Sequence, residues 1–138
     1  MKLAFIGLGA IGKPMSERLI DNGYDLNLFK RDKLKNDDQK KYFVDPVEAA
    51  KECDGLLICV TDDTAVESVL FGDNGVADSL KPNSFVIDFS TISPNKSISL
   101  HKRLAEKNIF YHHYLVYFYY INSYHNHYQW DAQTWASQ

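Results

Sequence analysis

Residues 2–12, KLAFIGLGAIG, contain the pattern that decides the fold. A short apolar run at residues 2–6 precedes three glycines spaced as G-x-G-x-x-G, and residues 12–22 then have a helical pattern, with Pro14 in the expected first turn. A strand, a glycine-rich turn and a helix in this order form the context in which this spacing indicates dinucleotide binding. The stretch therefore predicts a βαβ unit whose first turn holds a pyrophosphate.

Each glycine of this turn has a separate expected role. Gly7 allows the tight turn, Gly9 lets the backbone approach a pyrophosphate, and Gly12 allows the helix to pack closely on the strand. The helix N-terminus would offer free N–H groups to the phosphates. The alternative is that the pattern is only a tight βα turn. On the first interpretation, the residues that contact the cofactor are Gly7, Leu8, Gly9, Ala10, Ile11 and Gly12.

The chain after this unit alternates between apolar runs and helical patterns. The apolar runs predict strands at residues 25–29, 42–44, 55–60 and 84–89, and another that begins at 109–111. The helical patterns lie at residues 45–53, 62–71 and 93–108. Strands that alternate with helices indicate a parallel sheet with helices on both faces. We therefore expect an α/β fold, a doubly wound parallel sheet of Rossmann type, over residues 1–110.

Local signals indicate where the later helices begin and which faces they bury. Asp45 and Ser93 are expected N-caps, because a proline follows each of them at the first helical position. In the helix that follows Ser93, the residues Ile98, Leu100 and Leu104 are expected to supply most of the apolar face.

Composition restricts the classes of function. The chain has 138 residues, enough for one domain, and its net charge of −3 argues against a general nucleic-acid surface, which needs clustered cations. Its apolar runs are shorter than the roughly 18 residues of a membrane helix, so we expect a cytoplasmic protein. Cys53 and Cys59 lie in or beside apolar runs at a spacing that matches no common zinc or redox motif. Buried structural thiols are the expected interpretation.

Basic residues follow the second expected strand. An NAD-specific site usually has an acidic residue here, which accepts a hydrogen bond from the ribose 2′-hydroxyl, whereas this chain has Lys30 and Arg31. A cation would instead pair with the 2′-phosphate of NADP, and the planar arginine fork suits that contact. We therefore favour NADP over NAD, although Asp32 follows directly and the segment is also consistent with a solvated basic loop.

Hydroxyl side chains follow the strand at 84–89. Ser90 and Thr91 lie where this strand meets the next helix, so their hydroxyls are candidates to bind a substrate carboxylate or the nicotinamide end of the cofactor. The alternative is ordinary turn and capping chemistry, and position alone does not separate the two.

Four segments together resemble one family. FIGLGAIGKPM, FKRD, FGDNGV and VIDFSTISP occur in order between Lys2 and Phe110 and are similar to the N-terminal domain of β-hydroxyacid dehydrogenases. That group includes 3-hydroxyisobutyrate dehydrogenase, tartronate semialdehyde reductase and 6-phosphogluconate dehydrogenase. The resemblance implies an oligomeric, NAD(P)-dependent oxidoreductase of small 3-hydroxy acids, with no metal. By position it assigns the 2′-phosphate to Arg31, the cofactor lining to Val60, Thr61 and Ala65, and the nicotinamide and substrate to Ser90 and Thr91.

The chain departs from the family at Thr61, where proline is frequent, at Lys30, where asparagine is common, and above all after Phe110. Where relatives have a segment of the type Asp-Ala-Pro-Val-Ser-Gly-Gly, residues 111–138 are rich in tyrosine and histidine. The family's catalytic lysine has no counterpart, because no lysine follows Lys107. We expect a truncated chain with an aberrant tail, inactive alone, in which the first part of the tail extends the last strand and the rest is disordered.

Other interpretations of the tail are a metal site and a base-stacking surface. The histidines His112, His113, His125 and His127 have no suitably spaced carboxylate or thiol, and no cation accompanies the aromatic residues. For the whole chain, a non-catalytic dinucleotide-binding module and a non-functional gene product remain the alternatives to an enzyme fragment.

Overall fold

The computed structural model of the chain describes residues 1–29 and 41–114. The predictions for Lys30 and Arg31 lie outside the described residues, as do those for His125, His127 and the remainder of residues 115–138.

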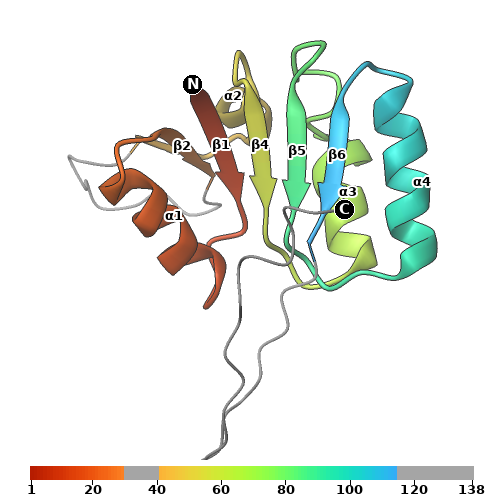
Figure 1. The fold of residues 1–138 in the computed structure, drawn as a ribbon, viewed down its shortest axis with the longest axis horizontal. Coiled ribbons are helices and arrows are strands. Elements are labelled where there is room, and N and C mark those ends of the chain that lie inside the picture. Colours follow the sequence, from red (N-terminus) through yellow and green to blue (C-terminus); the bar gives the residue numbers. More distant parts are fainter. Residues whose placement is uncertain (30–40, 115–138) are drawn as a thin grey trace, which may run out of the picture.

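Six parallel strands form one sheet in the order β3-β2-β1-β4-β5-β6 (Figure 1). Consecutive strands on each side of β1 are joined by right-handed crossovers in folds of this kind, and the order reverses at β1. The strands are β1 (Lys2–Ile6), β2 (Asp25–Phe29), β3 (Lys41–Phe43), β4 (Gly55–Ile58), β5 (Phe85–Asp88) and β6 (Phe110–His113). The predicted doubly wound α/β architecture is therefore confirmed.

Four helices connect the described strands, and their predicted starts are confirmed. The Asp45 side chain accepts a hydrogen bond from the N–H of Val47 at 2.9 Å, and the Ser93 hydroxyl accepts one from the N–H of Lys96 at 3.2 Å. A proline occupies the first turn in both cases. The helices are α1 (Gly12–Asp21), α2 (Pro46–Ala50), α3 (Asp63–Phe71) and α4 (Pro94–Ala105).

The two faces of the sheet are covered unequally by the described residues. Helices α2, α3 and α4 pack on one face, where Ile58, Val66 and Leu100 belong to the larger cluster of buried residues. On the other face α1 packs beside β1 and β2, and the set of buried residues there is smaller: Leu3, Phe5, Leu26, Leu28 and Leu57. Figure 1 shows α1 on one side of the sheet, with α2 and α3 behind the strands.

Helices α3 and α4 are joined by ion pairs around one carboxylate. Glu67 accepts from Lys96 Nζ at 3.1 Å and from Arg103 at 2.7 Å, and the Arg103 guanidinium also lies 3.6 Å from the centre of the Phe71 ring. These groups are only partly exposed, so their attraction is screened less than that of a fully solvated pair. The contacts hold α3 and α4 together on the face that they share.

One sequence prediction about α4 is wrong. Leu100 and Leu104 are fully buried, but the Ile98 side chain is 55% exposed. Leu100 and Leu104 lie four residues apart and therefore on the same side of the helix, whereas Ile98 is displaced from Leu100 by about 200° at 3.6 residues per turn. The apolar stripe of α4 is therefore narrower than its composition indicated.

The cysteine prediction is confirmed for Cys53, which is completely buried and lies 3.6 Å from the Nδ2 of the buried Asn27. Cys59 is only half-buried, at the end of β4. Burial raises the pKa of both thiols, so each is neutral near pH 7.

The edge strand β6 is anchored by a buried polar pair. The Tyr111 hydroxyl donates to Asp88 Oδ2 at 2.9 Å, while Asp88 Oδ1 accepts from the Ser90 N–H at 2.8 Å. Asp88 is completely inaccessible to solvent and Tyr111 is 5% exposed. Burial, together with the neighbouring carboxylate, raises the pKa of Tyr111 far above its ordinary value, so the phenol remains a donor. The expected boundary between residues 110 and 111 falls inside this strand.

Replacing Tyr111 by phenylalanine tests this anchor. The change leaves one oxygen of buried Asp88 without its donor, so the free energy of unfolding should fall by about 1–3 kcal/mol. Urea denaturation followed by circular dichroism measures the change. The matched control is Tyr24→Phe, which removes a hydroxyl from a ring that is 42% exposed and should leave stability nearly unchanged. Equal stability of both variants would show that the pair contributes nothing.

Candidate dinucleotide-binding site

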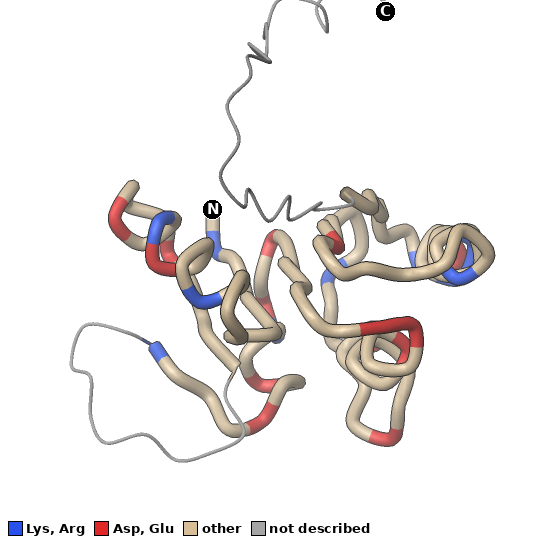
Figure 2. Tube along the Cα trace, turned by 90° about the horizontal axis from the view of Figure 1, so that it is seen from below, with Lys and Arg blue, Asp and Glu red and all other residues tan. Residues whose placement is uncertain are grey.

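The candidate site lies where β1 and β4 end side by side. Helix α1 follows β1 onto one face of the sheet, and α3 follows β4 onto the other, so the two connections diverge. In doubly wound folds, ligands bind in the crevice at this point. The N–H of Cys59 donates to the carbonyl of Ile6 at 2.9 Å and fixes the spacing of the two strand ends. Figure 2 views the molecule from this edge and shows the acidic residues that lead into α3.

Two of the three glycines are required by the packing of the protein itself. Gly7 has φ +104°, and a Cβ there would lie 2.1 Å from the Cys59 carbonyl oxygen. A Cβ on Gly12 would lie 1.8 Å from the Gly7 carbonyl oxygen. Both distances are far inside van der Waals contact with backbone atoms that cannot move freely, so Gly7 and Gly12 bring β1, β4 and α1 together.

The middle glycine has a different environment. A Cβ on Gly9 would meet no protein atom within 4 Å, and its φ lies outside the left-handed region that favours glycine. Neither protein packing nor backbone strain therefore accounts for glycine at this position. Glycine is expected here if a ligand must approach the backbone closely. This glycine spacing is typical of a turn that binds a dinucleotide pyrophosphate.

The start of α1 lacks a feature that the other described helices possess. Asp45, Asp62 and Ser93 cap α2, α3 and α4 through side-chain oxygens. At α1 the N-cap is Ile11, which makes no side-chain capping bond, and the first turn contains no acid. The first N–H groups of a helix need an external acceptor, and the helix dipole favours an anion there. The start of α1 is thus suited to hold phosphate oxygens.

On the β4 side of the crevice, most polar groups already have protein partners. The Thr61 hydroxyl donates to Asp62 Oδ2 at 2.8 Å, and the Ala65 N–H donates to Asp62 Oδ1 at 2.9 Å. These two bonds, the Ala65 N–H first, hold the pKa of Asp62 below its ordinary value. Thr61 is exposed, whereas Val60 and Ala65 are half-buried. Val60 and Ala65 can therefore offer mainly apolar contact to a cofactor.

After β5 the two predicted substrate contacts differ in accessibility. Ser90 is 1% exposed, and its Oγ accepts a hydrogen bond from the Val60 N–H at 3.0 Å, which joins the turns after β4 and β5. Nε2 of His113, at the end of β6, lies 2.9 Å from the Ser90 carbonyl oxygen. Thr91 is exposed. Of the two hydroxyls, that of Thr91 is the one open to a ligand, and the contact of Ser90 with substrate stays a prediction.

Asp63 was not among the sequence candidates, although it helps to shape the crevice. Its carboxylate accepts from the Ser93 N–H at 2.7 Å and from the Ser93 hydroxyl at 2.6 Å. The Ser93 hydroxyl and N–H hold the pKa of Asp63 below its ordinary value. The start of α3 is thereby tied to the turn that carries Thr91. The contact spans 30 residues of sequence, so no local signal could have indicated it.

The family model of the NAD binding domain of 6-phosphogluconate dehydrogenase matches residues 2–113. The chain belongs to this family. Among curated relatives, the 3-sulfolactaldehyde reductase of Escherichia coli is 36% identical over 100 residues, which cover 67% of this chain. The match spans 32% of the length of that reductase, so the chain corresponds to about a third of this relative.

Solved structures of the same fold agree with the domain described above. The 3-hydroxyisobutyrate dehydrogenase of Salmonella typhimurium superposes with a TM-score of 0.70 at 24% identity, over 80% of this chain and 40% of that chain. Psf3 in complex with NADP⁺ and 2-OPP superposes with a TM-score of 0.71 at 26% identity, over 79% and 40%. Together with the family model, this agreement in fold identifies the chain as an NAD binding domain of this family.

Within residues 1–29 and 41–114, no helix has the length and hydropathy needed to cross a bilayer. In the same part of the chain, histidines, cysteines and acids do not assemble into a group of three that could hold a metal ion.

Proposed function

We propose that this domain binds NADP, with NAD as the second choice, in an oxidoreductase that acts on the CH–OH group of a small 3-hydroxy acid or on the corresponding aldehyde. The observation that carries the proposal is the open space at Gly9 beside a helix start without a side-chain cap. Gly7 and Gly12 are explained by protein packing, whereas the open space at Gly9 is what a closely approaching ligand would need.

The proposed cofactor runs along the crevice from β2 to β5. Backbone N–H groups between Gly9 and Gly12 hold the pyrophosphate, and Val60, Thr61 and Ala65 line the path on the β4 side. Thr91 is exposed at the far end, where its hydroxyl can orient the nicotinamide or a substrate carboxylate. The chemistry that NADP supplies when bound is acceptance of a hydride from the carbon that carries the substrate hydroxyl.

The preference for NADP rests on the residues that follow β2. Lys30 and Arg31 come directly after Phe29, the last residue of β2, at the position where an NAD-specific site has an acid. They lie outside the described residues, so their sequence alone supports the proposal. Psf3 was solved with NADP⁺, whereas the family description names NAD, and both cofactors therefore occur among the similar proteins.

The substrate class rests on the relatives. The E. coli relative is a reductase of 3-sulfolactaldehyde, and a structure of the same fold is a 3-hydroxyisobutyrate dehydrogenase. Both names describe a small molecule with an acidic group, a sulfonate or a carboxylate, at one end and an aldehyde or a primary hydroxyl at the other. We extend this class to the protein of which the present domain is the dinucleotide-binding part.

Substitution of Gly9 by valine tests the site. A branched Cβ would occupy the space assigned to the pyrophosphate without touching protein atoms within 4 Å of the Cβ position, so the domain should fold but lose NADPH binding. Calorimetric titration with NADPH measures binding, and thermal unfolding measures stability. Gly12→Val is the matched comparison and should destabilise the domain itself, because its Cβ meets the Gly7 carbonyl. Unchanged NADPH affinity in a folded Gly9→Val variant would mean that the glycine pattern is only a turn.

Replacement of Arg31 by alanine tests the cofactor preference. The wild-type chain should bind NADPH more tightly than NADH, and loss of one charge-assisted contact should weaken NADPH binding by roughly 1.5–3 kcal/mol, about 10- to 150-fold in Kd. The affinity for NADH should change little, because NADH carries no 2′-phosphate. Parallel fluorescence titrations with the two cofactors give both values. Equal affinities in the wild-type chain would refute the NADP preference and leave dinucleotide binding itself intact.

A further inference from the structure

Three polar groups of Ser90 are held by other parts of the protein. Its N–H donates to Asp88 Oδ1 at 2.8 Å, and its hydroxyl accepts from the Val60 N–H at 3.0 Å. Its carbonyl oxygen lies 2.9 Å from Nε2 of His113. Because a carbonyl oxygen can only accept, Nε2 of His113 carries the proton and donates to Ser90. These contacts fix the backbone at the end of β5 in one orientation.

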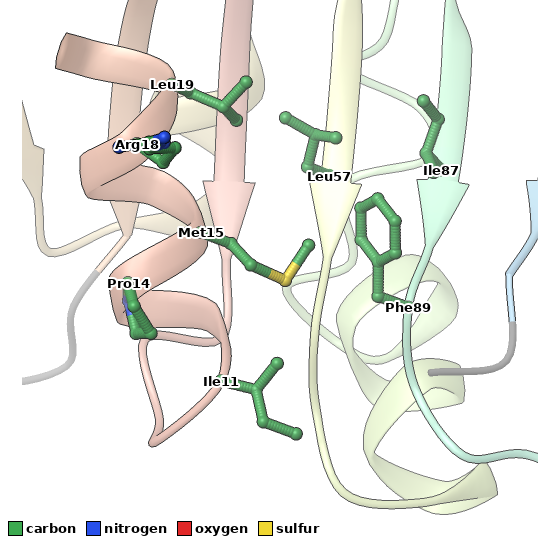
Figure 3. A pocket seen from close by; sticks show the side chains of 8 residues that line it. All are labelled: Ile11, Pro14, Met15, Arg18, Leu19, Leu57, Ile87 and Phe89. Carbon is green, nitrogen blue, oxygen red and sulfur yellow. The ribbon is translucent and has the colours of Figure 1, made fainter. Parts of the chain in front are cut away.

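The side chains at the end of β5 alternate between the two faces of the sheet, as in a regular strand. Phe89 lies on the α1 face, where its ring forms part of the wall of an apolar groove of about 700 Å³ beside α1 (Figure 3). Asp88 instead accepts from the hydroxyl of Tyr111, which belongs to the buried cluster on the opposite face. The alternation therefore continues past the last residue of β5.

The backbone groups at this point alternate between the two neighbouring strands. The Phe89 N–H donates to the Ile58 carbonyl of β4 at 2.8 Å, whereas the Ser90 carbonyl points the other way, to His113 of β6. The Ser90–Thr91 peptide is trans. In a trans peptide the carbonyl and the following N–H point in opposite directions, so the Thr91 N–H points back toward the β4 side.

The Thr91 N–H lies where β4 and β5 no longer pair. In a continued ladder its acceptor would be the Val60 carbonyl, two residues after Ile58. Within the part of the chain that the structure describes, no residue accepts a hydrogen bond from it. Thr91 is also exposed. Its N–H and hydroxyl are therefore two neighbouring donors open to a ligand at the carboxyl edge of the sheet.

We propose that His113 is a positioning residue for the nicotinamide end of the cofactor. By holding the Ser90 carbonyl, it keeps the Thr91 N–H directed toward the β4 side, where the N–H and hydroxyl of Thr91 donate to the carboxamide oxygen of the nicotinamide. A carbonyl oxygen can accept both bonds, and a donor that is already oriented loses little freedom when the ligand binds. The inference rests on the proposed function, since it concerns the same dinucleotide.

Two ligands separate this positioning role from a purely structural one. The ligand 2′,5′-ADP carries the adenosine and the 2′-phosphate of NADP but no nicotinamide, so it has no group for Thr91. His113→Leu removes the donor to Ser90. We expect this change to raise the Kd for NADPH by roughly 2- to 10-fold, the net effect of one hydrogen bond, and to leave the Kd for 2′,5′-ADP unchanged. Calorimetric titrations with both ligands give the two values.

Two further variants serve as rescue and control. His113→Gln places an amide N–H as far along the side chain as Nε2 of histidine, so it should restore the wild-type affinity for NADPH. His112→Leu makes the same change as His113→Leu one residue earlier in β6, at an exposed side chain, and should alter neither Kd.

The inference would be overturned by any of three results. They are an equal loss of affinity for the two ligands in His113→Leu, an unchanged affinity for NADPH in that variant, and a failure of His113→Gln to restore binding. Each of these results would leave dinucleotide binding itself intact. Binding of neither ligand by the wild-type chain would refute the proposed function, and the inference with it.

A second measurement uses the wild-type chain and does not depend on the folding of a variant. In NMR spectra of the ¹⁵N-labelled chain, saturating NADPH should move the Thr91 amide proton downfield and slow its exchange with water. Saturating 2′,5′-ADP should produce neither effect. A Thr91 amide that responds equally to both ligands, or to neither, would overturn the inference.

Discussion

The contact on which the site depends is the close approach of backbone to backbone at the end of β1. The Gly7 carbonyl occupies the space where a side chain at position 12 would lie, and the Cys59 carbonyl occupies the space beside Gly7. These two contacts bring the start of α1 next to the end of β4. Because the order of strands reverses at β1, the same contacts place the first N–H groups of α1 at the crevice where doubly wound folds bind ligands. Folding and the proposed cofactor binding therefore share one short segment, in which Gly7 and Gly12 serve packing and Gly9 is assigned to the ligand.

On the side of the site that β4, β5 and β6 form, polar contacts join distant parts of the chain. The Ser90 hydroxyl accepts a hydrogen bond from the Val60 N–H, and the Asp63 carboxylate accepts two from the N–H and hydroxyl of Ser93. The Tyr111 hydroxyl donates to the Asp88 carboxylate. Together they fix the turns after β4 and β5 relative to each other, so that Thr91 stays exposed at the carboxyl edge. The domain thus has the proposed cofactor site at one edge of the sheet and faces that are unevenly covered by the described helices.

Most of the architecture could be predicted from the sequence, because its signals are local. Alternating apolar runs gave the strand positions to within two residues, and Asp45 and Ser93 marked helix starts through chemistry that acts over three residues. Predictions were weaker where distant residues decide the outcome. Ser90 was a candidate ligand on position alone, yet its hydroxyl accepts from Val60, 30 residues away. Ile98 was assigned to an apolar face that proved narrower. The unequal burial on the two faces of the sheet depends on which helices cross to which face.

The central claim is that the glycine-rich turn and the uncapped start of α1 bind a dinucleotide phosphate. A titration of the ¹⁵N-labelled chain with NADPH, followed by amide resonances in NMR spectra, tests this claim residue by residue. The account predicts that the largest shifts occur at Gly9, Ala10, Ile11 and Gly12, with smaller ones at Val60 and Thr61. Absence of shifts at saturating NADPH, or shifts confined to residues away from this crevice such as those of α4, would contradict it.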